Sequence, residues 1–105
     1  MKYRVLILPR ARQDLEEIHE FIAVTQQQPL SAERWLDGVQ TVIEKLASNP
    51  RRGRVVPEQA LFGPETVIRQ VLFHRHRILY AIVGTDVQVL HVRRGTRGNL
   101  LREDL

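Results

Sequence analysis

Three β-rich runs in the second half of the chain, at residues 67–73, 76–83 and 87–93, constrain the fold more than any other feature of the sequence. The connections between them contain two and three residues, the length of a β-hairpin loop. The runs therefore predict an antiparallel meander. A three-stranded meander cannot bury its apolar face alone, because a sheet needs a second layer of structure against that face. The rest of the chain has to provide this layer.

Two amphipathic stretches in the first half predict the covering layer. In residues 10–24 the apolar side chains recur with the spacing of one helix face, and in residues 31–48 they form a continuous stripe. Ser31 is expected to cap the second helix, and the polar break at residues 25–29 is short enough for a helical hairpin. The acidic residues of the first helix, Asp14 among them, are expected on its solvent-exposed surface.

The order of these elements predicts an α+β fold with two layers. Residues 3–8 predict an N-terminal strand, and residues 50–66, with two glycines and three prolines, predict an irregular connection with room for a short edge strand. We therefore expect a helical hairpin packed on an antiparallel β-sheet. The 105 residues are enough for one such domain, spanning residues 1–105, and too few for two.

Hairpin register decides which side chains face the helices, because neighbouring residues of a strand point to opposite faces. We expect tight hairpins that place Phe73 opposite Arg77 and Val83 opposite Val87. A slip of one residue would exchange the two faces. On the expected register the core face carries Ile68, Leu72, Ile78, Tyr80, Ile82, Leu90 and Val92.

The other face of the sheet is the candidate partner surface, apolar at one end and basic at the other. Arg77 is expected opposite Arg93, and Leu79 opposite His91. Two arginines directly opposite each other destabilise a sheet unless an anion or a partner's carboxylate lies between them, or unless acids of the chain itself neutralise the pair. Val71, Leu79, Ala81 and Val89 would form an exposed apolar patch there. The candidate partner-binding residues are Arg69, Val71, Arg77, Leu79, Val89, Arg93, Arg94 and Arg97.

Positive charge is concentrated in the second half of the chain. Residues 1–50 hold six basic and seven acidic residues, a net charge of −1, whereas residues 51–105 hold ten arginines and five acids, a net charge of +5. The guanidinium group binds carboxylates and phosphates in bidentate fashion. This distribution favours an anionic partner.

Four segments in this order resemble the ParE/RelE toxin superfamily and are closer to ParE. They are ARQDLEEIHEFI, KLASNPRRGR, HRILYAI and VQVLHVRRGTR. The resemblance implies a growth-inhibiting, plasmid-stabilising toxin of a type II toxin–antitoxin system. It also implies a cognate antitoxin that binds the toxin through a helix and an extended segment, either on a toxin homodimer or in a heterotetramer.

The resemblance leaves two cellular targets open. ParE-like members poison DNA gyrase without catalytic residues of their own, and RelE-like members cleave mRNA on the ribosome. Ribonuclease activity would need cations and an acid–base group, for which the candidate catalytic residues are Arg69, Arg77, Arg93 and His91. Ribonuclease members often carry Tyr, His or Lys near the C-terminal end, and residues 95–105 contain none. This absence favours DNA gyrase as the target. The protein is an enzyme only if it is a ribonuclease of the RelE type.

A third interpretation is a diverged, non-toxic nucleic-acid-binding module that uses the basic half. Against it, Phe73 is the one aromatic residue expected on the exposed sheet face, where base stacking would need more. Trp35 is expected either in the core or against a partner, and His74 and His76 are expected in a turn.

Several other classes find no support in the sequence. The chain has no cysteine, which excludes disulfides and thiolate chemistry and suits a reducing cytoplasm. It shows no phosphate-binding glycine loop and no metal-ligand spacing, so we expect no cofactor and no metal. No run approaches the roughly 20 apolar residues of a membrane span, and no targeting segment is recognisable.

Overall fold

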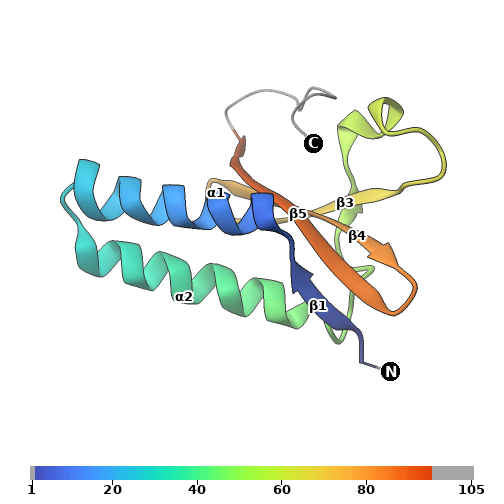
Figure 1. Ribbon diagram of the computed structural model, residues 1–105, viewed down its shortest axis with the longest axis horizontal. Coiled ribbons are helices and arrows are strands. Elements are labelled where there is room, and N and C mark those ends of the chain that lie inside the picture. Colours follow the sequence, from blue (N-terminus) through green and yellow to red (C-terminus); the bar gives the residue numbers. More distant parts are fainter. Residues whose placement is uncertain (1, 96–105) are drawn as a thin grey trace.

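The computed structural model of this chain describes residues 2–95 and has the expected α+β architecture (Figure 1). Two helices form one layer and a five-stranded sheet forms the other. In chain order the elements are β1 (Arg4–Ile7), α1 (Pro9–Glu20), the π-helical turn η1 (Phe21–Thr25), α2 (Pro29–Lys45), β2 (Arg54–Val55), the 3-10 turn η2 (Pro57–Leu61), β3 (Ile68–Phe73), β4 (His76–Val83) and β5 (Asp86–Arg94).

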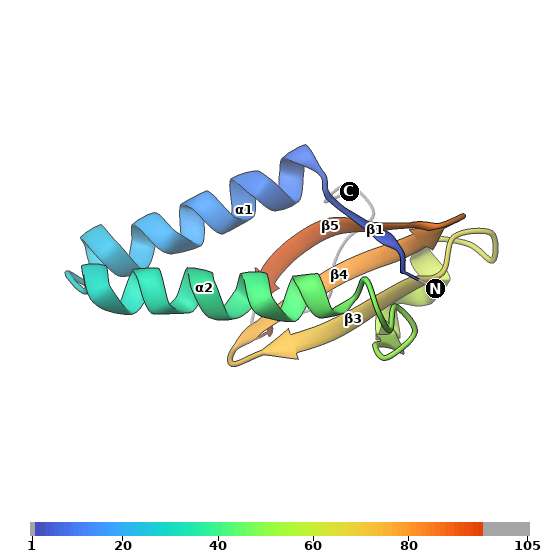
Figure 2. The ribbon, with the colours of Figure 1, turned by 90° about the horizontal axis from the view of Figure 1, so that it is seen from below.

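The sheet has the strand order β1-β5-β4-β3-β2, and every neighbouring pair is antiparallel except β1 and β5, which are parallel. The expected meander of β3, β4 and β5 is present, and β2 is the short edge strand. The helical hairpin covers one face of the sheet and extends beyond its end (Figure 2). Within residues 2–95 no helix is long and apolar enough to cross a membrane.

Proline sets the start of both helices. Pro9 and Pro29 each occupy the first turn, where the missing N–H costs no hydrogen bond. The expected cap at Ser31 is therefore wrong, because α2 begins two residues earlier, and its N-cap residue Gln28 makes no side-chain capping bond. Between the helices, Gln27 adopts a positive φ of 54°.

The main core lies between the helices and the sheet. From the helices it takes, among others, Ala11, Leu15, Trp35, Val39 and Ile43. From the sheet it takes Val71, Ile78, Tyr80, Val87, Val89 and Val92. The helical stripes predicted from periodicity therefore supply this core, but the sheet members differ from the expected set on two of the three strands.

The register of β3 was predicted wrongly because both hairpins are one residue tighter than expected. Phe73 pairs with His76, and Val83 pairs with Asp86. Each loop then has two residues, and its first residue takes a positive φ, 53° at His74 and 62° at Gly84. A shift of one residue exchanges the faces of β3. Val71 and Phe73 consequently pack toward the helices, whereas Ile68 and Leu72 lie on the other face.

A β-bulge in β5 shifts the pairing of β4 with β5 by one residue, so that the pairs beyond the bulge have the register expected from the sequence. Tyr80 pairs with Val89, whereas the preceding residue Leu79 pairs with His91, so Leu90 is the extra residue. Val87 and Val89 therefore face the helices, contrary to expectation, and Leu90 faces away from them. Beyond the bulge the expected pairs are confirmed, Leu79 with His91 and Arg77 with Arg93.

The face away from the helices is partly covered by the chain itself. Val56 and Phe62, on either side of η2, pack with Ile68, Leu79, Ala81 and Leu90 in a second apolar cluster. The expected exposed patch is therefore wrong: Leu79 and Val89 are fully buried, and Val71 and Ala81 are nearly so. Val71 and Val89 belong to the main core instead.

Candidate partner-binding cleft

A cleft of about 540 Å³ opens between α1 and the end of the sheet where β4 begins and β5 ends. Its floor is apolar and includes Ile18, Ile22 and Val92, and its α1 side also carries the acids Asp14 and Glu17. Its other side is basic. There the lining side chains are Arg75, His76, Arg93 and Arg94.

The basic side of the cleft forms because the β3–β4 turn lies against the end of β5. His76 pairs with Arg94 across the ladder, and the Gly95 amide donates to the Arg75 carbonyl at 2.8 Å. Arg94 is exposed and Arg93 is partly buried. The cleft thus brings together two of the predicted partner-binding arginines, Arg93 and Arg94, whereas Arg97 lies outside the described residues.

Trp35 and His76 connect α2 to this end of the sheet. The Trp35 indole N–H donates to His76 Nδ1 at 3.3 Å, and the two rings meet edge to face with centroids 5.1 Å apart. Burial lowers the pKa of His76 from its usual value, and the charges of Arg94 and His74 lower it further. Because indole can only donate, the bonded His76 nitrogen carries no proton. His76 is therefore a half-buried neutral residue of β4 and not the expected turn residue.

Asp14 anchors α1 to β5 beside the cleft. Its carboxylate lies 3.0 Å from His91 Nδ1, accepts the Val92 amide at 3.0 Å and accepts Arg10 Nε at 3.2 Å. Burial alone would raise the pKa of Asp14, but the bonds from His91, Val92 and Arg10 outweigh it and lower the pKa. The expectation that Asp14 lies on the solvent-exposed surface is wrong, since it is 7% exposed.

Arg77 forms a buried ion pair on the face away from the helices. Its two terminal nitrogens lie 2.8 and 2.9 Å from the carboxylate oxygens of Glu58, and its Nε donates to Gln70 at 2.7 Å. The acid that pairs with Arg77 thus comes from the chain itself, from η2. Arg77 is 8% exposed.

Arg69 supports the loop before β2. It donates to the Gly53 carbonyl at 2.8 Å. Tyr80, a core residue as expected, holds the same loop, because its hydroxyl accepts the Gly53 amide at 3.0 Å and donates to the Pro50 carbonyl at 2.7 Å. Burial raises the pKa of Tyr80, so the phenol stays protonated and can donate.

The four candidate catalytic residues therefore do not share one accessible site. Arg69 bonds to the loop at Gly53, Arg77 to Glu58 and His91 to Asp14. His91 is 2% exposed. Among residues 2–95, no group of three or more His, Cys, Asp or Glu side chains is placed to hold a metal ion.

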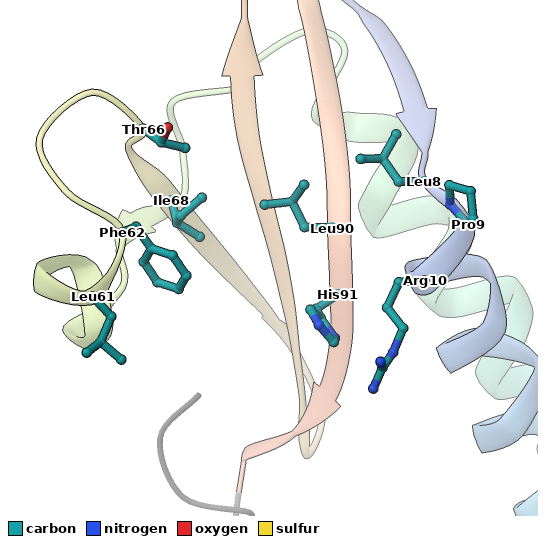
Figure 3. Close-up of a pocket in the computed structure, with 9 residues that line it drawn as sticks. All are labelled: Leu8, Pro9, Arg10, Leu61, Phe62, Thr66, Ile68, Leu90 and His91. Carbon is teal, nitrogen blue, oxygen red and sulfur yellow. The ribbon is translucent and has the colours of Figure 1, made fainter. Parts of the chain in front are cut away.

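A second, mostly apolar cavity of about 490 Å³ lies between η2 and the start of α1 (Figure 3). Leu61 and Phe62 lie on one side and Leu8, Pro9 and Arg10 on the other, with Leu90 and His91 of β5 between them. Sequence reasoning missed this cavity because it depends on the position of the irregular segment 56–66.

A comparison with known protein families identifies one family. The family described as the ParE toxin of the type II toxin–antitoxin system parDE matches residues 5–98. No curated protein sequence matches the chain.

Two solved structures share the fold. The chromosomal ParDE toxin–antitoxin system from P. aeruginosa matches with a TM-score of 0.69 and 16% identity, covering 89% of this chain and 96% of that one. The toxin–antitoxin complex RelBE2 from Mycobacterium tuberculosis matches with a TM-score of 0.56 and 22% identity, covering 90% and 99%.

Proposed function

This chain belongs to the ParE toxin family of type II toxin–antitoxin systems, and we propose on that premise that it poisons DNA gyrase in the bacterial cytoplasm and is held inactive by a cognate antitoxin. The observation that carries the proposal is the family match, which spans residues 5–98. Growth inhibition and plasmid stabilisation are the consequences expected of such a pair.

The internal bonding of the candidate catalytic groups supports a poison over a ribonuclease. A general acid or base must come within hydrogen-bonding reach of the substrate proton. His91 is buried against Asp14, and Arg77 is buried and bonded to Glu58 and Gln70. A gyrase poison needs a binding surface and no acid–base pair. The structural roles of His91 and Arg77 are therefore compatible with this activity.

The cleft beside α1 suits the antitoxin. Its apolar floor and basic side complement an amphipathic segment that carries acids along one edge. The contacts proposed from sequence are revised accordingly. Arg93 and Arg94 are kept, Arg75 and Phe21 are added, and the buried side chains of Val71, Leu79 and Val89 are replaced as direct contacts.

The target is tested by expressing the protein from a tightly controlled promoter and pulse-labelling DNA and protein synthesis separately. We expect DNA synthesis to fall first and a DNA-damage response to follow. If protein synthesis falls first, the proposal fails in favour of the RelE-type ribonuclease. If nucleic-acid binding occurs without any growth arrest, it fails in favour of the non-toxic module.

The antitoxin cleft is tested by co-expressing the product of the neighbouring reading frame with charge-reversed toxins. Arg94→Glu places an acid on the basic side of the cleft and should weaken rescue of growth. Arg12→Glu, a charge reversal at an exposed position of α1, is the matched control and should leave rescue unchanged. Equal rescue with both variants would contradict the assignment of the cleft.

A further inference from the structure

We propose that Trp35 and His76 make the cleft proton-sensitive: His76 is neutral in the free protein and takes up a proton when a carboxylate of an acidic protein segment binds beside it. The acidic segment as partner rests on the proposed function, in which an antitoxin occupies the cleft. The consequence is that affinity for this partner rises as pH falls.

The geometry holds His76 in one protonation state. Trp35 donates its indole N–H to Nδ1, so the ring proton of neutral His76 is on Nε2. The donor and acceptor come from separate elements, α2 and β4, which pack against each other in the core. Protonation at Nδ1 would remove the acceptor and break the bond. The free protein therefore resists protonation of His76.

The surrounding charges act in the same direction. The acids on the α1 side of the cleft are Asp14, which already accepts three hydrogen bonds, and Glu17, which accepts one from Gln13. Neither acid shifts the pKa of His76, whereas Arg94 and His74 lower it. Trp35 is the neighbour from α2. The cations come from the β3–β4 turn and β5, and are His74 when protonated, Arg75, Arg93 and Arg94.

A bound carboxylate reverses this balance. It places a negative charge beside the basic side of the cleft and favours the imidazolium form, with the proton taken from solvent. The Trp35 N–H is then released from His76. Between the free and bound pKa values, affinity rises by up to about tenfold for each unit of falling pH.

Tryptophan fluorescence reports the switch, because Trp35 is the one tryptophan in the 105-residue sequence. An imidazolium quenches indole emission more strongly than a neutral imidazole does. We expect emission to fall as pH is lowered from 8 to 5, with a midpoint below the ordinary histidine value of about 6.5. His76→Gln should abolish the transition, and His19→Gln, a histidine of α1, should retain it. A transition that persists in His76→Gln overturns the proposal.

A second variant tests the proposal even if His76→Gln does not fold. Trp35→Phe keeps an aromatic ring and removes the N–H donor, so the pKa of His76 should rise when its ring protons are followed by NMR. A merely structural contact would leave that pKa unchanged. An unchanged value in a folded Trp35→Phe protein also overturns the proposal.

The partner is represented by a synthetic peptide of alternating leucine and glutamate. Saturating peptide should move the fluorescence midpoint to higher pH, whereas a leucine–lysine peptide should not. A midpoint that stays fixed, a peptide that fails to bind at pH 6, or a shift produced only by single-stranded DNA overturns the proposal. These readouts need no toxicity, so they distinguish failure of the switch from failure of gyrase poisoning.

Discussion

Asp14 lies on the side of α1 that faces the sheet, and its carboxylate joins the helix to β5 at the residue after the bulge. Periodicity alone placed it among the solvent-exposed acids. Its position next to Leu15, at the edge of the apolar stripe, was the available signal, and the resemblance already included it in the segment ARQDLEEIHEFI. Sequence spacing could not reveal its partners, which are 77 and 78 residues away.

Asp14→Asn should lower the free energy of unfolding by about 2–4 kcal/mol, because it removes a buried charged acceptor of three bonds. Urea denaturation measures the loss. Glu16→Gln, at an exposed position of the same helix, is the control and should change stability by less than about 0.5 kcal/mol. Equal stability of the two variants would show that the anchor contributes nothing.

The lowered pKa of Asp14 also predicts that the free energy of unfolding decreases at low pH, which gives the stability curve an acid limb. The unfolded carboxyl, with a pKa near 3.8, binds protons more readily than the folded one. The stabilisation from Asp14 is therefore complete above that pH and is lost as pH falls through the lowered folded value. Asp14→Asn should flatten this limb in denaturation curves recorded from pH 6 to pH 2.

Arg77 was a candidate catalytic residue, and its pairing with Arg93 was predicted correctly. The carboxylate that pairs with Arg77 belongs to Glu58, which is 19 residues away in a segment without periodicity, so the sequence offered no means of assigning it. Of the two alternatives left open by the sequence, an external anion or an acid of the chain itself, the structure has the second at Arg77.

Breaking this pair from either side should be costly. Glu58→Ala leaves Arg77 buried without its carboxylate and should destabilise the protein by about 3–5 kcal/mol. Replacing both residues, Glu58→Leu with Arg77→Met, should recover most of that loss in denaturant unfolding. If Arg77→Met alone is as stable as the parent but non-toxic, a functional role for Arg77 would replace the structural one.

At the scale of elements, both helices and the meander could be predicted, because each is encoded by local periodicity and loop length, whereas the edge strand was expected only as a possibility within an irregular connection. The faces of β3 and part of β5 could not. Two-residue loops and a one-residue bulge each exchange faces, and the bulge at Leu90 shows in the sequence only as two adjacent apolar residues, Val89 and Leu90, in an otherwise alternating strand. The sequence also did not predict that η2 covers the outer face of the sheet, because the segment that contains η2 has no hydrophobic periodicity.

The contact between α2 and β3 depends on Gly38. A methyl group there would collide with the ring of Phe73, so this helix glycine allows the ring to approach closely. Alanine in a helix interior is normally favoured over glycine by about 1 kcal/mol, but we expect Gly38→Ala to destabilise the protein.

Thermal unfolding of Gly38→Ala measures this effect. Gln40→Ala, at an exposed position of α2, is the control for helix propensity and should be neutral or stabilising. Adding Phe73→Leu to Gly38→Ala should recover part of the loss, because the smaller side chain makes room. A gain in stability from Gly38→Ala alone would contradict the described packing.

In the whole molecule, the concentration of positive charge in the second half of the chain and the two-layer fold together place the basic side of the cleft at one end of the sheet. The sequence predicted that the second half would meet an anionic partner, and the fold brings Arg75, Arg93 and Arg94 together beside α1. What the sequence could not supply was the cleft itself, because it forms only when the β3–β4 turn packs beside the end of β5.

Gyrase as the target of this toxin is best tested with purified components. Protein at increasing concentration is incubated with gyrase, ATP and relaxed plasmid, and supercoiling and trapped DNA cleavage are measured on gels. We expect loss of supercoiling with accumulation of cleaved DNA, both reversed by the antitoxin. Unimpaired supercoiling, together with mRNA cleavage when ribosomes are supplied, would contradict gyrase as the target.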